Sequence, residues 1–267
     1  MAKNTTQEER LDYLVEAFKA DSDEYKNLEV SDDIEEKRRV LRSLMNIRMP
    51  KEMPVDVLEI QNRYLSERAQ EKGVVRLEDI PEIKKGLSIW QGDITRLAVD
   101  AIVNAANSQM LGCFVPMHTC IDNCIHTFAG IQLRSECNRK MDMLREKYGK
   151  NYEQPTAVPM LTSGYNLPAK NVIHIVGPIV QGRLTKKDEE DLASCYRSCL
   201  DLAEENGLKS IAFCCISTGV FMFPNERAAE IAVETVTKWL NESGSDMRIV
   251  FNVFKDIDYL FYKNHLE

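Results

Sequence analysis

The segment Gly112–His126 concentrates the side chains of this chain that can do chemistry. It holds three of the eight cysteines, two of the four histidines and one carboxylate. Thiolates and imidazoles at such close spacing are the ligands that zinc prefers in proteins. The segment follows an asparagine-rich turn, Asn104–Asn107, and leads into an expected helix. We therefore predict a metal site that faces whatever ligand this turn binds.

A second loop has the features of a phosphate-binding turn. Ser217, Thr218 and Gly219 follow an apolar strand and provide small side chains and backbone amides that can approach phosphate oxygens closely. Phe221 or Phe223, just after them, can cover the apolar face of a ribose or a base. This loop predicts a nucleotide-like ligand.

Two polar residues at other strand ends agree with that ligand. Asp93, in Gly92–Thr95, can accept a hydrogen bond from an exocyclic amine, and Asn107 can serve ribose hydroxyls as donor or acceptor. Each residue taken singly is also explained by local structure, Asp93 as an Asx-turn residue and Asn107 as a loop cap. The interpretation therefore depends on the loops occurring together.

Helical periodicity and charge dominate residues 1–85. Apolar residues at helical spacing predict helices over 8–20, from Ser31 as a possible N-cap, and over 55–71 with Gly73 ending the last. No catalytic motif occurs there. We expect a helical extension packed on the main domain, with docking of a partner as the alternative.

Strands alternate with helices from Gly86 onward. This pattern predicts a three-layer α/β domain with a mainly parallel or mixed sheet, whose ligands bind at the carboxyl ends of the strands. The expected strands are 87–91, 101–103, 171–176, 210–216 and 248–254; the expected helices are 122–148, 186–205 with Thr185 as N-cap, and 225–240 with Asn225 as N-cap.

The composition narrows the class of protein. The chain has 267 residues, 44% of them hydrophobic, which suffices for a sizeable core. A formal net charge of −8 argues against a general nucleic-acid binder. We see neither a secretory signal nor an apolar run of membrane-spanning length. Eight cysteines in such a chain predict a cytoplasmic protein with free or metal-bound thiols.

Four motifs together resemble macrodomains, which bind ADP-ribose. Gly92–Thr95, Val103–Asn107, Ile121–His126 and Ser217–Phe221 stand in the order found in that family. The resemblance covers residues 86–267 and implies a three-layer α/β/α fold with a mixed sheet. Residues 1–85 then form the N-terminal helical extension.

Residues Cys113–Cys120 replace the glycine-rich loop of typical hydrolytic macrodomains. In this respect the chain is similar to the zinc-dependent macrodomains of bacteria, which carry a helical N-terminal extension and remove ADP-ribose from modified proteins. Some are encoded beside a sirtuin-type ADP-ribosyltransferase and lipoylation proteins, so a lipoyl-carrier protein is a candidate substrate. The resemblance implies that Cys113, His118 and Cys120 hold Zn²⁺ and leave its fourth position to substrate or water.

The resemblance also implies roles for the remaining site residues. Asp93 and the backbone of Ile94 would bind adenine, and Asn107, Asp122 and zinc would meet at the distal ribose, with Asn123 orienting substrate or water. The residues expected to cradle the diphosphate are Ser217, Thr218, Gly219, Val220 and Phe221. Since two thiolates cancel the charge of the ion, it should acidify bound water only weakly. We therefore expect zinc to hold and polarise the substrate.

The other cysteines and histidines are expected to be structural. Asp122 and His126 are four residues apart and share a helix face, but we interpret His126 as a packing residue. The further residues expected to pack rather than bind metal are Cys124, Cys137, His174, Cys195, Cys199, Cys214 and Cys215.

The leading hypothesis is a zinc-dependent hydrolase of mono-ADP-ribosylated protein. One alternative is a non-catalytic module that recognises ADP-ribosylated protein and holds a structural zinc. Asp122 and an open zinc position favour the enzyme, because a pure binding module needs neither. The other alternative is an O-acyl-ADP-ribose deacylase, because a similar distal-ribose site can serve both leaving groups.

Overall fold

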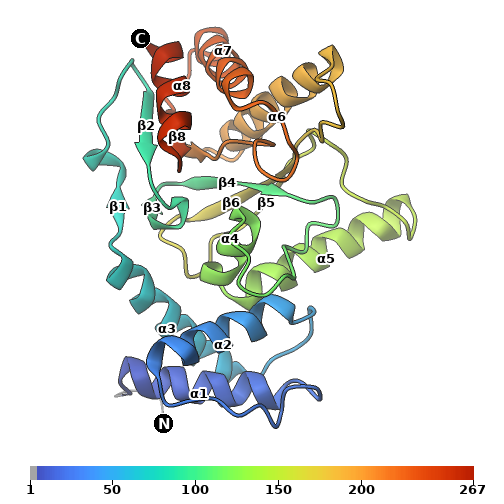
Figure 1. Ribbon diagram of the computed structural model, residues 1–267. Coiled ribbons are helices and arrows are strands. Elements are labelled where there is room, and N and C mark those ends of the chain that lie inside the picture. The colour runs from blue at the N-terminus through green and yellow to red at the C-terminus, as the bar shows by residue number, and fades with distance from the viewer. Residues whose placement is uncertain (1–4) are drawn as a thin grey trace.

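A six-stranded mixed sheet forms the centre of the computed structural model, which describes residues 5–267 (Figure 1). Five strands are mutually parallel, and β5 pairs antiparallel with β6 at one edge. In spatial order the strands are β2 (Leu87–Gln91), β8 (Arg248–Val253), β7 (Ser210–Phe213), β4 (Ala101–Ala106), β6 (Asn171–Val176) and β5 (Met160–Ser163). The predicted mixed sheet of a three-layer α/β domain is confirmed.

Helices cover both faces of this sheet (Figure 1). One layer contains α6 (Lys186–Glu205), α7 (Asn225–Ser243) and α8 (Asp256–Leu266); the other contains α4 (Ile121–Ala129) and α5 (Ile131–Tyr148). The sheet is apolar on both faces, and Val103, Ile173 and Ile249 are fully buried. No helix within residues 5–267 is long and apolar enough to cross a membrane.

The N-terminal extension is helical, as predicted. It consists of α1 (Gln7–Ala20), α2 (Ile34–Ile47) and α3 (Val55–Lys72), which lie beyond α4 and α5 as seen from the sheet (Figure 1). Their apolar faces form a separate core to which Ile131 of α5 contributes. Because α2 packs on α4, and α4 packs on β4, α4 lies between the extension and the sheet.

The chain between the extension and the sheet contains a small second sheet. The two-residue strands β1 (Val75–Arg76) and β3 (Leu97–Ala98) pair in parallel, and the short 3₁₀ helices η1 (Leu77–Asp79) and η2 (Ile94–Arg96) flank them. The domain boundary expected at residues 85 and 86 stays a prediction. The central sheet begins at Leu87.

The single helix expected over 122–148 is wrong, because Gly130 divides it. Gly130 has a φ of +95°, which takes the chain out of helical geometry. A Cβ there would lie 2.8 Å from Nε2 of Gln61 on α3, so the break lets α3 approach closely. The result is two helices, α4 and α5.

Several expected element ends also differ. Asp33, not Ser31, caps α2, because its carboxylate accepts from the backbone of Glu36. Pro224 stands at the N-cap of α7, while Nδ2 of Asn225 donates to Asp258 of α8. The strand expected over 210–216 ends at Phe213, and β4 continues to Ala106. Strand β5 and helix α8 were not anticipated.

Gly130→Ala is expected to destabilise the fold by about 1–3 kcal/mol, since it combines an unfavourable φ with a steric clash. Urea unfolding monitored by circular dichroism measures this loss. Gly149→Ala is the matched control, because Gly149 has a similar φ of +111° but no described atom of residues 5–267 lies within 4 Å of an added Cβ. If Gly130→Ala lost no more stability than the control, the close approach of α3 would not be the reason for this glycine.

Candidate active site

The carboxyl ends of the parallel strands bring the predicted loops to one edge of the sheet. Asp93 follows β2, Asn107 follows β4, and the Ser217 loop follows β7. Gly177, which follows β6, packs so tightly on this last loop that a Cβ there would lie 2.1 Å from Oγ of Ser217. Loops that are far apart in the sequence therefore share one surface, as expected for this topology.

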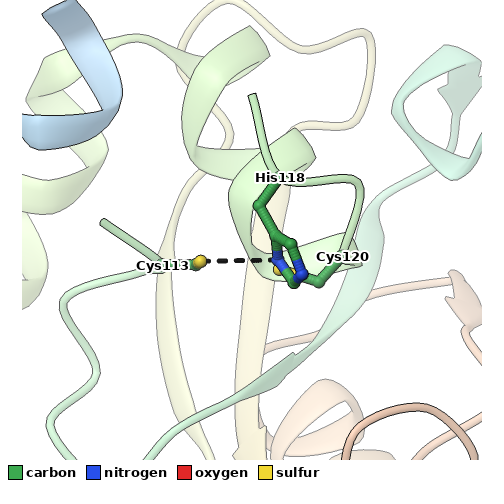
Figure 2. A group of neighbouring side chains, drawn as sticks. All are labelled: Cys113, His118 and Cys120. Atoms are coloured by element: carbon green, nitrogen blue, oxygen red, sulfur yellow. Dashed lines mark hydrogen bonds between the residues drawn. The ribbon is translucent and has the colours of Figure 1, made fainter. Parts of the chain in front are cut away.

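The predicted metal ligands Cys113, His118 and Cys120 converge in the loop before α4 (Figure 2). Their donor atoms all lie within 4.8 Å of one another, and Sγ of Cys113 is 3.5 Å from Nδ1 of His118. A tetrahedral zinc with ordinary bond lengths separates a sulfur and a nitrogen ligand by about 3.6 Å. All three side chains are half-buried. The donors therefore fit one ion with little rearrangement.

Cys120 also caps α4. Its Sγ accepts from the backbone N–H of Asn123 at 3.4 Å, and the helix N-terminus favours negative charge on the sulfur. Burial nevertheless raises the pKa of the Cys120 thiol to about 12, and nearby Cys113 and Asp122 contribute to the rise. Because a bound cation would offset this effect, the position suits a metal-ligating thiolate.

Asp122 is held in the first turn of α4 by two asparagine amides. Asn104 donates to its Oδ1 at 2.8 Å and Asn107 donates to its Oδ2 at 3.4 Å. The side chain is 5% exposed, and burial raises its pKa to about 6 against the opposing effects of Asn104 and Arg134. A carboxyl group with a pKa this close to neutrality can both accept and return a proton.

His126 lies beside this carboxylate. Its Nε2 is 3.5 Å from Oδ1 of Asp122, and neither ring nitrogen has a hydrogen-bond partner within residues 5–267. Burial lowers the pKa of His126 well below its usual value, so the ring is neutral near pH 7. Gly112 packs on it so closely that a Cβ would lie 2.8 Å from the ring. As predicted, His126 and the half-buried Cys124 lie outside the three-ligand group.

A buried polar cluster extends behind Asp122. Nδ2 of Asn104 also contacts Nδ1 of His174 at 3.0 Å, and Nε2 of His174 lies 2.9 Å from Oγ1 of Thr162. Because the amide donates, Nδ1 accepts and Nε2 carries the proton. Cys137, His126 and His174 are close enough to hold a metal, but both nitrogens of His174 already have partners. This arrangement agrees with the packing role expected for Cys137 and His174.

The predicted diphosphate loop is strained and partly unsatisfied. Ser217 has a φ of +65°, and its buried Oγ has no hydrogen-bond partner in the part of the chain that the structure describes. Internal bonds hold the loop, because the backbone N–H of Phe223 donates to the carbonyl of Ser217 and Oγ1 of Thr218 donates to that of Cys215. Strained residues with free polar groups are typical of ligand sites.

The two phenylalanines of this loop lie in different environments. Phe223 is 1% exposed and belongs to the core, so the expectation that it could cover a ribose or base is wrong. Phe221 is half-buried, Val220 is exposed, and Gly219 has open space where a Cβ would lie. Only Phe221 of the pair remains available to a ligand.

Asp93 stabilises its own turn, as the alternative interpretation expected. Its Oδ1 accepts from the backbone and hydroxyl of Thr95, and its Oδ2 pairs with Nζ of Lys72 at 2.6 Å. Burial opposes ionisation, but Lys72 and Thr95 outweigh it and lower the pKa of Asp93. Ile94 is buried beside it. Binding of adenine by this pair stays a prediction.

Several residues that build the site were not anticipated. Asn104 was expected in the asparagine-rich turn, but it lies within β4, where its amide donates to Asp122. No pattern in the sequence pointed to Arg42, Asn46 or Lys72. These residues lie in the extension and reach the site only through the packing of α2 and α3. Asn123 was expected to orient substrate or water, and in the structure its amide donates to the carbonyls of Cys113 and Val115.

Comparison with known proteins agrees with this geometry. The family model described as "Macro domain" matches residues 103–232. A protein-ADP-ribose hydrolase of Treponema medium is 49% identical over 261 residues, which cover 96% of this chain and 98% of the relative. The chain belongs to the macrodomain family.

Two further proteins are similar to this macrodomain. A protein-ADP-ribose hydrolase of Staphylococcus aureus strain MRSA252 is 44% identical over 256 residues, covering 95% of this chain and 94% of the relative. The structure of a Trypanosoma brucei macrodomain in complex with ADP-ribose superposes with a TM-score of 0.64 at 31% identity, covering 82% of this chain and 93% of that one.

His174 is expected to make the stability of this macrodomain dependent on pH. Burial lowers its pKa to about 3, whereas an unfolded chain has a histidine pKa near 6.5. Between these values the unfolded chain binds one more proton at this position, so stability falls as the pH falls. Between pH 7 and pH 5, protonation of His174 alone should lower the free energy of unfolding by about 2 kcal/mol.

His174→Gln tests this expectation in urea unfolding at pH 7, 6 and 5. The variant should be less stable at pH 7 but should lose less stability on acidification. His126 and Lys140, the other ionisable groups that influence or adjoin the ring, remain in both proteins. If the variant and the parent lost the same stability on acidification, His174 would not be the cause of the pH dependence.

Proposed function

We propose that this macrodomain is a zinc-dependent hydrolase that removes ADP-ribose from mono-ADP-ribosylated protein. One observation carries the proposal: a half-buried group of two thiols and an imidazole adjoins a buried carboxylate at the sheet edge where macrodomain ligands are expected. The relatives named protein-ADP-ribose hydrolases support the removal of ADP-ribose from protein, since they align along nearly the whole chain.

In this proposal ADP-ribose lies across the carboxyl ends of the strands. Asp93 and the backbone of Ile94 bind adenine at one end, and the loop Ser217–Phe221 holds the diphosphate. The hydroxyl of Ser217, which has no partner within residues 5–267, can donate a hydrogen bond to a phosphate oxygen. The distal ribose then lies near Asn107 and Asp122, whose side chains are in contact at 3.4 Å.

Cys113, His118 and Cys120 would hold the metal ion. Zinc would act as a Lewis acid that polarises an oxygen of the substrate. The two sulfur donors favour a thiophilic ion, and among residues 5–267 the group has three protein donors, which leaves a fourth position for substrate.

Asp122 is the candidate general base. Asn104 and Asn107 fix its carboxylate, and its raised pKa suits proton transfer near neutral pH. The oxygen of water bonds to the anomeric carbon as the bond to the acceptor protein breaks. One proton of that water passes to Asp122 and then to the released acceptor side chain.

The proposed substrate and setting follow the family resemblance. A lipoyl-carrier protein is the candidate for the modified protein. A reducing bacterial cytoplasm is the proposed compartment, and it is supported by cysteines that are all free in residues 5–267.

Asp122→Asn is expected to lower turnover for the release of ADP-ribose from modified protein by a factor of about 10²–10⁴. The amide retains the shape of the side chain but cannot act as the base, so affinity for free ADP-ribose should change little. Calorimetry measures the affinity, and release of labelled ADP-ribose measures turnover. A changed KM with unchanged turnover would exclude the catalytic role.

His118→Ala is expected to remove both bound zinc and hydrolysis. Elemental analysis of the purified protein gives the zinc content, and a chelator should stop hydrolysis by the parent. Cys124→Ser is the matched control, because Cys124 lies near the same loop but outside the ligand group. Full activity in metal-free, folded protein would refute zinc dependence.

A further inference from the structure

Arg42 of the N-terminal extension contacts the metal-ligand loop, defined here as Cys113–Cys120. Its Nη2 donates to the backbone carbonyl of His118 at 2.7 Å and to Oδ1 of Asn123 at 2.9 Å. The same nitrogen lies 3.7 Å from Sγ of Cys124. One guanidinium group therefore joins α2 both to a proposed ligand and to the first turn of α4.

Asn123 continues this connection to the other end of the loop. It is fully buried, and its Nδ2 donates to the carbonyls of Cys113 at 3.2 Å and Val115 at 2.9 Å. Arg42 therefore holds the backbone of His118, and Asn123, which Arg42 also contacts, holds that of Cys113. These are two of the three proposed ligands.

A second residue of α2 holds the middle of the loop. Oδ1 of Asn46 accepts from the backbone N–H of Met117, whose φ of +58° is unfavourable for this residue type. Nδ2 of Asn46 donates to Oγ1 of Thr127 in α4. The side chains of Arg42 and Asn46 therefore attach the loop to α2 at two points.

The loop has few hydrogen bonds of its own. Within Cys113–Cys120 the backbone makes one such bond, from His118 to Val115 at 3.2 Å. Its shape therefore depends on side chains from outside, and α2 supplies two of them. Groups that orient metal ligands in advance strengthen binding, because less order has to be created when the ion arrives.

We propose that Arg42 is a positioning residue for the metal ligands, and that the N-terminal extension in this way completes the metal site of the macrodomain. The proposal rests on the metal site of the proposed function but not on hydrolysis. Without the guanidinium, the carbonyl of His118 and Oδ1 of Asn123 each lose a charged donor. The loop then samples conformations in which its three ligand atoms no longer converge.

The test compares Arg42→Met with the parent full-length protein. Methionine retains much of the apolar stem but has no donor. Zinc affinity, measured by competition with a chromophoric chelator at fixed pH, should fall about 10- to 100-fold. Arg42→Lys should recover part of this loss. Arg39→Met on the exposed side of α2 is the matched control and should bind zinc as the parent does.

Hydrogen–deuterium exchange on the metal-free proteins provides a second readout that needs neither zinc nor activity. Exchange should rise over residues 113–120 in Arg42→Met and stay unchanged over α6 and α7. Unchanged zinc affinity, or unchanged exchange in the loop, would overturn the inference. A parent protein that binds no zinc would refute the metal part of the proposed function, and loop exchange alone would then decide the role of Arg42.

Discussion

The N-terminus of α4 is the point on which the candidate site depends. Its cap is Cys120, and its first turn carries Asp122 and Asn123. The helix begins where the metal-ligand loop ends, so one short segment sets the position of a proposed metal donor, a carboxylate and an amide that holds the loop. Packing between β4 on one side and α2 on the other fixes this segment in place. Any movement of α4 would therefore shift Cys120, Asp122 and Asn123 together relative to the strand-end loops.

Burial determines the chemistry of that segment. Asp122 and Asn123 are removed from water, which is unfavourable for polar groups unless they find partners. Asn104, Asn107 and Arg42 supply those partners from two strand-associated positions and one distant helix. The same burial raises the pKa of Asp122 to about 6. Burial thus accounts both for the hydrogen-bonded order of this segment and for the raised pKa of Asp122.

The local features of the fold could be predicted from the sequence. Apolar periodicity identified α1, α3 and α6 to within a residue or so, because each has one buried face and a polar opposite face. The break at Gly130 could not be predicted in this way. Residues on both sides continue the helical pattern, and the glycine is needed only because Gln61 of α3 approaches there.

The sequence by itself determined which reactive side chains the site contains. Cys113, His118 and Cys120 form a recognisable donor set from their types and spacing, and the strand-end loops identify the ligand class by resemblance. Only the tertiary structure decided how these groups are held. Arg42 donates to Asn123 across 81 positions of the chain, and the buried Asp122 takes its hydrogen bonds from Asn104 and Asn107, 18 and 15 positions away. Hydrogen bonds and desolvation act through space, so they leave no local pattern in the residues that provide them.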